Sequence, residues 1–173
     1  MKAFVRDLIV TVILTIIIFF LVQSTIQVSI VNGSSMEPSL QHGQRLIVNK
    51  AVYFFHEPES GDIVIFHPPD NPKSDPFIKR VIGVPGDTVE IKAGIVYVNG
   101  SPLDEPYVKQ PPDYTFTAEK IPENNYFVLG DNRNNSNDSH TGWTVPENNI
   151  IGKAWLSIWP PREWGVIPNY ASP

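Results

Sequence analysis

The chain of 173 residues contains no cysteine. A disulfide framework, a thiolate metal site and a cysteine nucleophile are therefore excluded. Basic residues are also in the minority: 13 lysines and arginines face 18 aspartates and glutamates, which gives a net charge of −5 and a pI near 5.3. Nucleic-acid-binding domains are usually basic, and this sequence has no cluster of lysine and arginine, so we expect no nucleic-acid partner.

Metal-ligating patterns are scarce as well. The four histidines show no pairing at i and i+4, and we expect them at the surface: His42, His56, His67 and His140. The aspartates that could pair for an aspartyl mechanism or hold a cation are Asp62, Asp87, Asp131 and Asp138. The stretch from Asp131 lacks the spacing of a calcium loop with a closing glutamate, and Arg133 would add positive charge to such a site. We therefore predict no metal and no cofactor.

Only one long apolar run is present, Leu8–Val22, and it contains no charged residue. A helix of about fifteen residues reaches only about 22 Å, so crossing a hydrocarbon core of about 30 Å also requires Ala3–Val5 and Gln23–Ile26. Lys2 and Arg6 precede the run, and basic residues favour the cytoplasmic side. These features predict a single-pass anchor in the cell membrane with a cytoplasmic amino terminus.

The predicted organisation is an anchor over residues 1–27, followed by an extracytoplasmic domain over residues 28–173. A cleavable signal peptide is the alternative, because it also has a basic start and an apolar middle of this length. In that case Val22-Gln23-Ser24 would be a weak cleavage site. Both interpretations place the rest of the chain outside the cytoplasm.

Beyond the apolar run, short stretches of apolar and alternating residues predict strands. They are Ile26–Ile30, Arg45–Asn49, Asp62–Phe66, Ile78–Val84, Thr88–Lys92, Ile95–Val98, Tyr126–Leu129 and Ile150–Ile158. Lys92-Ala93-Gly94 predicts a hairpin link, and Asn99-Gly100 predicts the following turn. Seventeen prolines and eleven glycines argue against long helices beyond the anchor. The predicted fold class is therefore mainly β, with extended loops.

A polar turn after the first strand presents a serine. In Asn32–Pro38, Ser35 lies two residues after a glycine and three before a proline, which is typical of a turn with an accessible hydroxyl. Such a turn is more often a plain linker. Two other stretches favour chemistry: Phe77–Gly83, which sets Lys79 in an apolar frame, and the polar loop Gly130–Ser139. Together these stretches suggest a serine nucleophile that is activated by a lysine.

A serine nucleophile needs a base within hydrogen-bond reach, and a lysine serves only when its amine is neutral. An exposed lysine has a pKa near 10.4, so burial would have to lower that pKa. Alternation along the strand places Lys79 on one face with Phe77 and Val81, and Arg80 on the other face. The alternative is that Lys79 is a charge that protects an edge strand from aggregation.

These stretches resemble, in the same order, the motifs of bacterial type I signal peptidases. The matching segments are Ser35–Pro38, Gly61–Phe66, Phe77–Asp87, Gly130–Ser139 and Ile151–Trp155. The resemblance implies a membrane-anchored serine endopeptidase that removes signal peptides from secretory preproteins after small residues. It also implies two partners, the preprotein and the lipid bilayer, and a β-rich catalytic domain of coiled antiparallel sheets or a partial barrel.

The resemblance assigns roles to individual residues. Ser35 would be the nucleophile and Lys79 its general base. The supporting residues would be Ser136, which hydrogen-bonds and orients the lysine, Asp131, which pairs with Arg80, and Asp138, which supports the same loop.

The chain departs from the family pattern at the oxyanion site and in the polar loop. Many relatives have a serine two residues before the nucleophile, and here Gly33 occupies that position, so we expect the backbone N–H groups of Ser35 and Gly33 to bind the oxyanion. The loop has Asn134 and His140 where relatives often carry aspartate and arginine. We therefore expect no salt bridge from Asp138 to position 140 at neutral pH.

Cleavage after small residues requires shallow apolar pockets. The resemblance places six residues there, each of which is equally compatible with ordinary core packing: Val31, Met36, Leu40, Ile65, Phe77 and Ile78. An extended substrate would pair with an exposed strand edge. Four tryptophans are candidates for the bilayer interface, with core packing as the alternative: Trp143, Trp155, Trp159 and Trp164.

Two other functions share some of these features. A self-cleaving regulatory protease of the repressor type also uses a serine and a lysine, but it needs a DNA-binding amino-terminal domain, and the apolar start of this chain argues against one. A non-catalytic anchored β-domain would bind an exported partner, and its serine would not be acylated.

Overall fold

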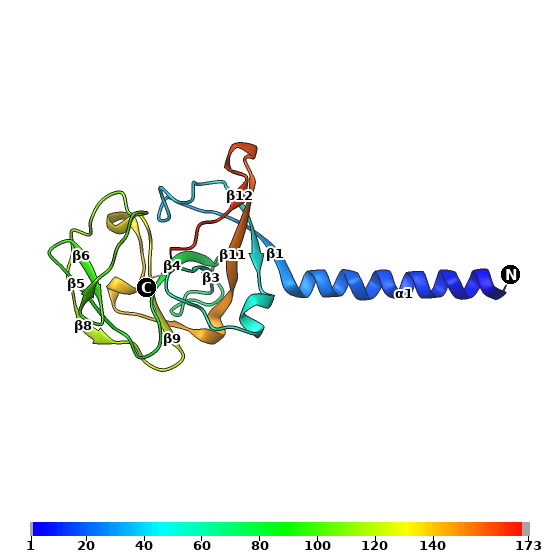
Figure 1. Cartoon of the computed structure of the whole chain (residues 1–173), viewed down its shortest axis with the longest axis horizontal. Helices are drawn as coiled ribbons and strands as arrows, with labels where there is room; N and C mark the ends of the chain where they lie inside the picture. Colours follow the sequence, from blue (N-terminus) through cyan, green and yellow to red (C-terminus); the bar gives the residue numbers. More distant parts are fainter. Residues whose placement is uncertain (1, 171–173) are drawn as a thin grey trace.

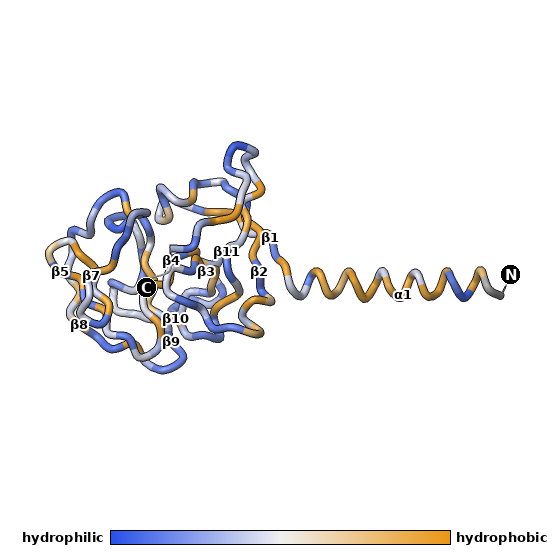
Figure 2. The backbone as a smooth tube through the Cα atoms, in the orientation of Figure 1, coloured by the Kyte–Doolittle hydropathy of each residue, from blue (hydrophilic) through white to orange (hydrophobic). Residues whose placement is uncertain are grey.

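The computed structural model describes residues 2–170. Helix α1 (Lys2–Thr25) projects from a β-rich body (Figure 1), and its side chains from Phe4 to Ser24 are exposed. By length and composition, the segment Phe4–Thr25 of this helix could cross a membrane. Figure 2 shows the helix as a mostly hydrophobic segment. Its 24 residues reach about 36 Å, because the helix includes both flanking segments that the length argument requires, except Ile26.

The helix joins the body without a linker, because α1 ends at Thr25 and strand β1 begins at Ile26. Lys50 lies at this junction: its backbone N–H donates to the Thr25 carbonyl (2.8 Å), and its Nζ donates to the Gln23 carbonyl (2.9 Å). Carbonyl groups at a helix C-terminus have no partner within the helix, and a cation also complements the helix dipole there. Lys50 therefore ties the end of α1 to the body.

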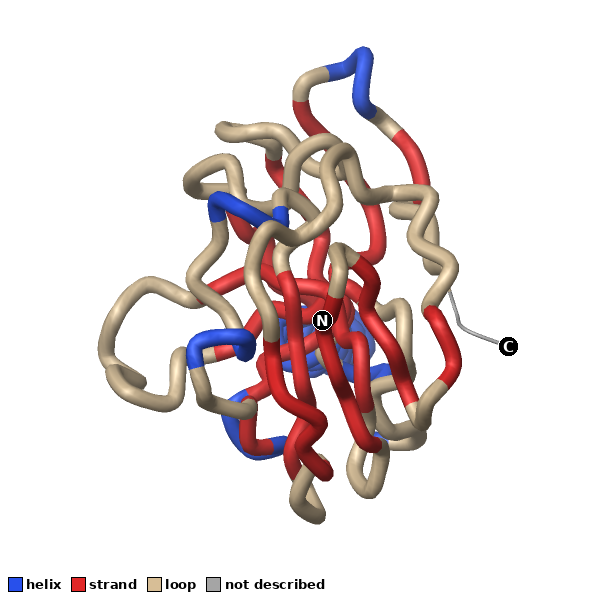
Figure 3. The backbone as a smooth tube through the Cα atoms, turned by 90° about the vertical axis from the view of Figure 1, so that its left-hand side faces the viewer, coloured by secondary structure: helices blue, strands red, loops and turns tan. Residues whose placement is uncertain are grey.

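Two antiparallel sheets make up the body. The larger has the order β1-β2-β11-β3-β4-β9-β10, with β12 paired to β11, and is curled into a half-barrel (Figure 3). Its strands are β1 (Ile26–Ile30), β2 (Arg45–Asn49), β3 (Ile63–Phe66), β4 (Phe77–Gly83), β9 (Asn125–Leu129), β10 (Val145–Pro146), β11 (Ile150–Trp159) and β12 (Gly165–Val166). The smaller has the order β7-β6-β5-β8, with β5 (Thr88–Lys92), β6 (Ile95–Val98), β7 (Ser101–Pro102) and β8 (Phe116–Lys120). The mainly β prediction is confirmed.

Short 3-10 helices interrupt the loops: η1 (Ala51–Phe54), η2 (Arg133–Asn135), η3 (Ser139–Thr141), η4 (Glu147–Asn149) and η5 (Pro161–Glu163). Each predicted strand is present, with ends that differ by a residue or so. The sequence prediction missed β8, because only its first residue is partly buried and the strand shows no apolar alternation. It also missed β7, β10 and β12, which have only two residues each.

The two predicted turns of the smaller sheet are present. Ala93 and Gly94, with φ of 50° and 76°, connect β5 to β6, and Asn99 and Gly100, with φ of 52° and 80°, connect β6 to β7. Two successive residues with positive φ give the backbone twist that a tight hairpin needs. These turns therefore follow directly from the local sequence.

Strand β4 lies where three clusters of buried apolar residues meet. Ile78 belongs to a cluster with β2, Ile82 to a cluster with the smaller sheet, and Val81 to a cluster with β9 and β10. Full burial of one such side chain contributes about 1.5–3 kcal/mol. The strand is therefore held from several sides, and it carries Lys79 and Arg80 between these apolar contacts.

The tryptophans divide between core and surface. Trp143 packs beside Phe66, with ring centroids 6.2 Å apart, so the core alternative holds for this residue. The others have exposed side chains: Trp155, Trp159 and Trp164.

Candidate active site

The polar turn that contains Ser35 lies between β1 and β2 and is clamped by the loop that follows β9. The Asn132 N–H donates to the Ser35 carbonyl (2.9 Å), and Asn132 Nδ2 donates to the Ser34 carbonyl (3.1 Å). A Cβ on Gly130 would collide with the Ser35 carbonyl oxygen and the Ser136 hydroxyl. The close approach of the two segments therefore requires glycine at this position.

Lys79 extends from β4 to the same place. Its Nζ lies 2.7 Å from Ser35 Oγ and 3.1 Å from the Ile78 carbonyl oxygen, and only 5% of the residue is exposed. Burial lowers the pKa of Lys79 to about 8, although the negative charges of Asp138 and Asp131 oppose this shift. The predicted contact with Ser35 is present. The edge-strand alternative is wrong, because β4 pairs with β3 on one side and β9 on the other.

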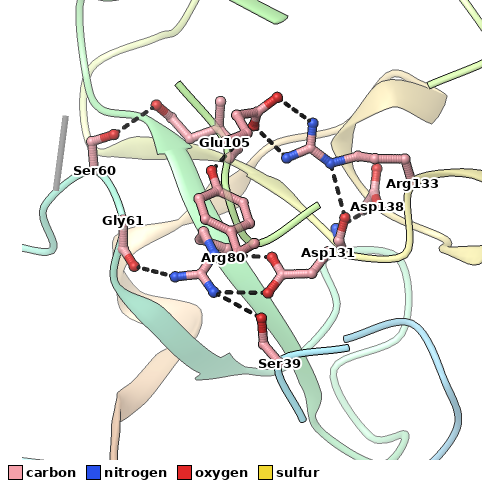
Figure 4. A network of polar contacts seen from close by, with 11 residues as sticks. Ser39, Ser60, Gly61, Arg80, Glu105, Asp131, Arg133 and Asp138 are labelled. Atoms are coloured by element: carbon pink, nitrogen blue, oxygen red, sulfur yellow. Dashed lines mark hydrogen bonds and ion pairs between the residues drawn. The ribbon is translucent and has the colours of Figure 1, made fainter. Parts of the chain in front are cut away.

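Arg80 lies next to Lys79 in the chain and forms a buried ion pair. Its Nε and Nη2 donate to the two carboxylate oxygens of Asp131, at 2.9 and 2.7 Å, and both side chains are 0% exposed. Nη1 donates to the Gly61 carbonyl at 2.9 Å (Figure 4). The predicted pairing of Arg80 with Asp131 is thus present. It joins the centre of β4 to the first residues of the polar loop with two parallel hydrogen bonds.

A second ion pair, between a buried arginine and a partly exposed glutamate, was not predicted. Arg133 donates to both carboxylate oxygens of Glu105, at 2.8 and 2.5 Å, and its Nε donates to the Gly130 carbonyl at 3.1 Å (Figure 4). Glu105 lies in the proline-rich segment that precedes β8. A single glutamate in that segment carries no local signal of its partner, so sequence reasoning had no means to find this pair.

Asp138 supports the loop from within. Its Oδ2 accepts from the Gly130 N–H (2.8 Å), and its Oδ1 lies 2.6 Å from His140 Nδ1. The His140 ring stacks on Tyr114 with centroids 4.0 Å apart. We expected no ion pair at position 140 at neutral pH, yet the His140 ring is in contact with the Asp138 carboxylate. A neutral imidazole with a proton on Nδ1 donates to a carboxylate, so the contact does not require a charged ring.

Ser136 does not make the predicted hydrogen bond to Lys79. Its hydroxyl is buried and has no hydrogen-bond partner among the described residues. The Lys79 amine is directed instead at the Ser35 hydroxyl and the Ile78 carbonyl. Ser136 Oγ lies against Gly130, one of the residues that bring the loop to the serine turn.

A pocket of about 360 Å³ opens beside Ser35 and Lys79. Four of the six predicted pocket residues line it: Val31, Met36, Phe77 and Ile78. The other two, Leu40 and Ile65, are not among the lining residues; they are 1% and 0% exposed and belong to the core cluster with β2. Their burial between sheet and turn explains the difference.

One of the two predicted oxyanion donors has another partner in the structure. The Ser35 N–H has no hydrogen-bond partner among the described residues and is free to donate. The Gly33 N–H instead donates to His42 Nδ1 at 3.0 Å, so its assignment as the second donor is wrong. On the polar side of the pocket, Asn135 Nδ2 donates to Ser34 Oγ at 2.9 Å, and both residues line the pocket.

The four aspartates considered for an aspartyl mechanism or a cation site each bind other partners. Besides the contacts of Asp131 and Asp138, Asp62 accepts from the Tyr53 hydroxyl (2.9 Å) and pairs with Lys153, and Asp87 accepts from Asn99 Nδ2 (2.7 Å). Among residues 4–170, no group of three or more His, Asp and Glu side chains has a metal-binding arrangement.

A serine hydroxyl that touches a buried amine, in a pocket of a curled β-sheet, defines a candidate serine hydrolase. Comparison with known proteins identifies the family. A family model described as signal peptidase, peptidase S26, matches residues 4–159. The probable signal peptidase I-1 of Synechocystis sp. is 46% identical over 144 residues, which cover 80% of this chain and 74% of the relative. Signal peptidase IB of Staphylococcus aureus (strain COL) is 36% identical over 183 residues, which cover 95% and 94%.

A crystal structure of a signal peptidase I from Enterococcus faecalis V583 is also similar, with a TM-score of 0.51 and 32% identity. The match covers 57% of this chain and 97% of that chain. The chain therefore belongs to the signal peptidase family, peptidase S26, and is a peptidase. The family and the apolar helix α1 together indicate a membrane-anchored protein.

Proposed function

We propose that this peptidase is a serine endopeptidase that cleaves N-terminal signal peptides from secretory preproteins after small residues, with Ser35 as nucleophile and Lys79 as general base. The observation that carries the proposal is the 2.7 Å contact between Lys79 Nζ and Ser35 Oγ, with the amine shielded from water. The names of the relatives, which are signal peptidases, support the substrate class.

In the proposed reaction, Lys79 carries one proton in each of two half-reactions. Neutral Lys79 accepts the Ser35 hydroxyl proton, and the serine oxygen attacks the scissile carbonyl to form a tetrahedral intermediate. The Lys79 ammonium then donates that proton to the leaving amine, which releases the mature protein and leaves an acyl-enzyme. In the second half-reaction, Lys79 accepts a proton from the attacking water and returns it to Ser35. The signal peptide is freed as a carboxylic acid, which loses its proton to solvent.

The oxyanion of the intermediate needs at least one donor besides the Ser35 N–H. Because the Gly33 N–H is engaged by His42, we assign this role to the Ser34 hydroxyl, which is oriented by Asn135. Asn135 Nδ2 donates to Ser34 Oγ, so that the hydroxyl proton of Ser34 remains available to another acceptor. Both side chains border the pocket in which the carbonyl would lie.

The substrate pocket supports selection of small side chains. Its apolar wall consists of Val31, Met36, Phe77 and Ile78. Val31, Met36 and Ile78 belong at the same time to a buried core cluster, so they cannot move aside without disturbing the core. A rigid wall of this kind excludes larger side chains next to the scissile bond.

The proposed topology follows from the charges around the anchor. The anchor is α1, with Lys2 and Arg6 on the cytoplasmic side, and the extracytoplasmic catalytic domain begins with β1. The boundary expected after residue 27 moves to Thr25, because Ile26 and Gln27 pair with β2. The catalytic dyad and the pocket then face the compartment into which preproteins emerge.

The test is cleavage of a preprotein in detergent by the purified chain and by Ser35→Ala and Lys79→Ala. Each substitution removes one half of the dyad, so we expect a loss of roughly 10³-fold or more. Far-UV circular dichroism verifies that the variants are folded. Full activity in either variant would refute the dyad. Labelling of Ser35 by an acylating inhibitor, absent in Lys79→Ala, separates the enzyme from a non-catalytic binding domain.

A further inference from the structure

The segment at residues 167–170, named here the C-terminal strap, contacts Arg80 in β4 and Asp62 just before β3. It lies beyond residues 4–159, which the family model matches. The Ile167 N–H donates to the Trp155 carbonyl (3.0 Å), and its side chain packs on the core cluster with β2. Asn169 Nδ2 donates to Asp62 Oδ1 at 2.9 Å. The strap is therefore attached to the body by both backbone and side chains.

The strap ends on Arg80. The Tyr170 ring centroid lies 5.3 Å from the Arg80 guanidinium and 5.2 Å from the ring of Tyr107, whose own centroid is 4.0 Å from the guanidinium. Two rings from distant parts of the chain thus contact one buried cation, while Asp131 and the Gly61 carbonyl hold its N–H groups. Cation–π contacts are stronger when the cation is desolvated, as it is here.

The geometry connects the strap to Lys79 through the backbone of β4. Lys79 and Arg80 are consecutive, so their side chains extend to opposite faces of the strand. A rotation or shift of β4 that lets Arg80 move must also move Lys79. The second attachment point, Asp62, immediately precedes β3, in which Ile63 pairs with Arg80. The strap therefore contacts both β4, which carries Lys79, and the residue that precedes β3.

We propose that the C-terminal strap is a positioning element for the general base: by packing on Arg80 it keeps β4 in the register and rotation that hold the Lys79 amine against Ser35 and away from water. This inference rests on the proposed function of Lys79. Tyr170 is not among the residues that line the substrate pocket, and its ring contacts Arg80 and Tyr107, so it acts on Lys79 only indirectly. A displacement of about 1 Å in a catalytic group is enough to reduce a rate by up to about 10²-fold.

The test compares Tyr170→Ala with Tyr170→Phe in the full chain. We expect Tyr170→Ala to lower kcat for preprotein cleavage roughly tenfold at pH 7.5 with little change in KM, because the pocket is untouched. Tyr170→Phe keeps the ring and should retain wild-type activity. Tyr97→Ala is the matched control, because the Tyr97 ring also contacts a cation, Lys92 at 4.8 Å, but in the smaller sheet.

The pH profile separates positioning from general loss of structure. The charged groups that act on Lys79 are Asp131 and Asp138, both in the loop after β9, and neither is changed by the substitution. Admission of water to the amine would therefore move the acid limb of kcat/KM to higher pH in Tyr170→Ala, so that the deficit shrinks by pH 9.5. An equal deficit at every pH, or none, would overturn the inference.

A readout without catalysis keeps this outcome distinct from failure of the proposed function. Titration of the ¹⁵N-labelled Lys79 amine by NMR, assigned with Lys79→Ala, should show a higher midpoint in Tyr170→Ala than in the wild type or Tyr170→Phe. If the wild type does not cleave preproteins but the midpoint shifts, the proposed function fails and the strap is supported. If cleavage depends on Ser35 and Lys79 but the midpoint does not shift, only the strap fails.

Discussion

Burial changes the chemistry that the Lys79 amine can offer to the neighbouring Ser35 hydroxyl. With the pKa of Lys79 lowered to about 8, roughly a tenth of the amine is neutral at pH 7. With the ordinary lysine pKa of about 10.5, the neutral fraction at that pH would be smaller by about 300-fold. The shift therefore gives the proposed mechanism a base in usable amount and an ammonium that is acidic enough to protonate the leaving amine.

The pH dependence of catalysis follows from this shift. In the proposed mechanism the neutral amine is the active form, so kcat/KM should rise about tenfold per pH unit below pH 8 and level off above it. The measurement is the initial rate of preprotein cleavage at low substrate from pH 6 to 10. Lys79→Arg is the control, because a guanidinium stays protonated throughout and should be inactive at every pH. A limb centred near 10.5 would show that the amine is not shielded in solution.

The proposed oxyanion donors give a second prediction for single residues. Asn135→Ala removes the amide that orients Ser34, and Ser34→Ala removes the donor itself, so each should lower kcat by about 10²-fold with a small effect on KM. Asn134→Ala is the matched control from the same loop, since Asn134 bonds to Pro111 and Asp113 instead. Steady-state kinetics of the three variants decide the assignment. An unchanged kcat in Ser34→Ala would show that the Ser34 hydroxyl is not the second oxyanion donor.

Among the elements, strand β4 and the polar loop after β9 form one rigid unit. The loop has only short 3-10 turns, yet three buried charges hold it: Asp131 on Arg80, Arg133 on Glu105, and Asp138 on the Gly130 N–H. Removal of one partner of a buried ion pair leaves an uncompensated charge, which typically costs about 3–5 kcal/mol. An irregular segment is thereby kept as fixed as a strand, which a site with a 2.7 Å dyad contact requires.

The whole molecule combines an apolar helix and a β-rich body that share few contacts. The side chains of Phe4–Ser24 are not buried against the body, and the dyad, pocket and loop all lie within the body. The junction at Thr25 and the Lys50 hydrogen bonds are the described ties between them. The apolar helix and the candidate active site therefore lie in separate parts of the chain.

Deletion of residues 2–25 tests this separation. Because few body contacts are lost, we expect the shortened chain to fold with a similar Tm, to move from the membrane to the soluble fraction, and to cleave a soluble peptide within about tenfold of the full chain. Cell fractionation, thermal unfolding and peptide cleavage measure the three quantities. The same deletion with Ser35→Ala controls for contaminating peptidases. Loss of folding would show that the helix stabilises the body.

Local features of the chain were predictable because neighbouring residues produce them. The apolar run determines α1, the alternating stretches determine the longer strands, and Ala93-Gly94 determines a hairpin turn. The motifs around Ser35 and Lys79 were also sufficient to identify the family resemblance, which the comparisons confirm. Each of these inferences needs only a few consecutive residues and their order.

Only the tertiary structure decided the contacts that form the candidate site. The packing of β4 between β3 and β9 buries Lys79, the turn at Gly33 gives its N–H to His42, and the loop at Glu105 reaches Arg133. The strap contact of Tyr170 with Arg80 is of the same kind. Apart from Gly33 and His42, which are nine residues apart, these partners are distant in the chain, and chain segments of similar composition have many possible partners. Folding selects one set of partners, because polar groups that are buried away from water must find donors and acceptors within the protein.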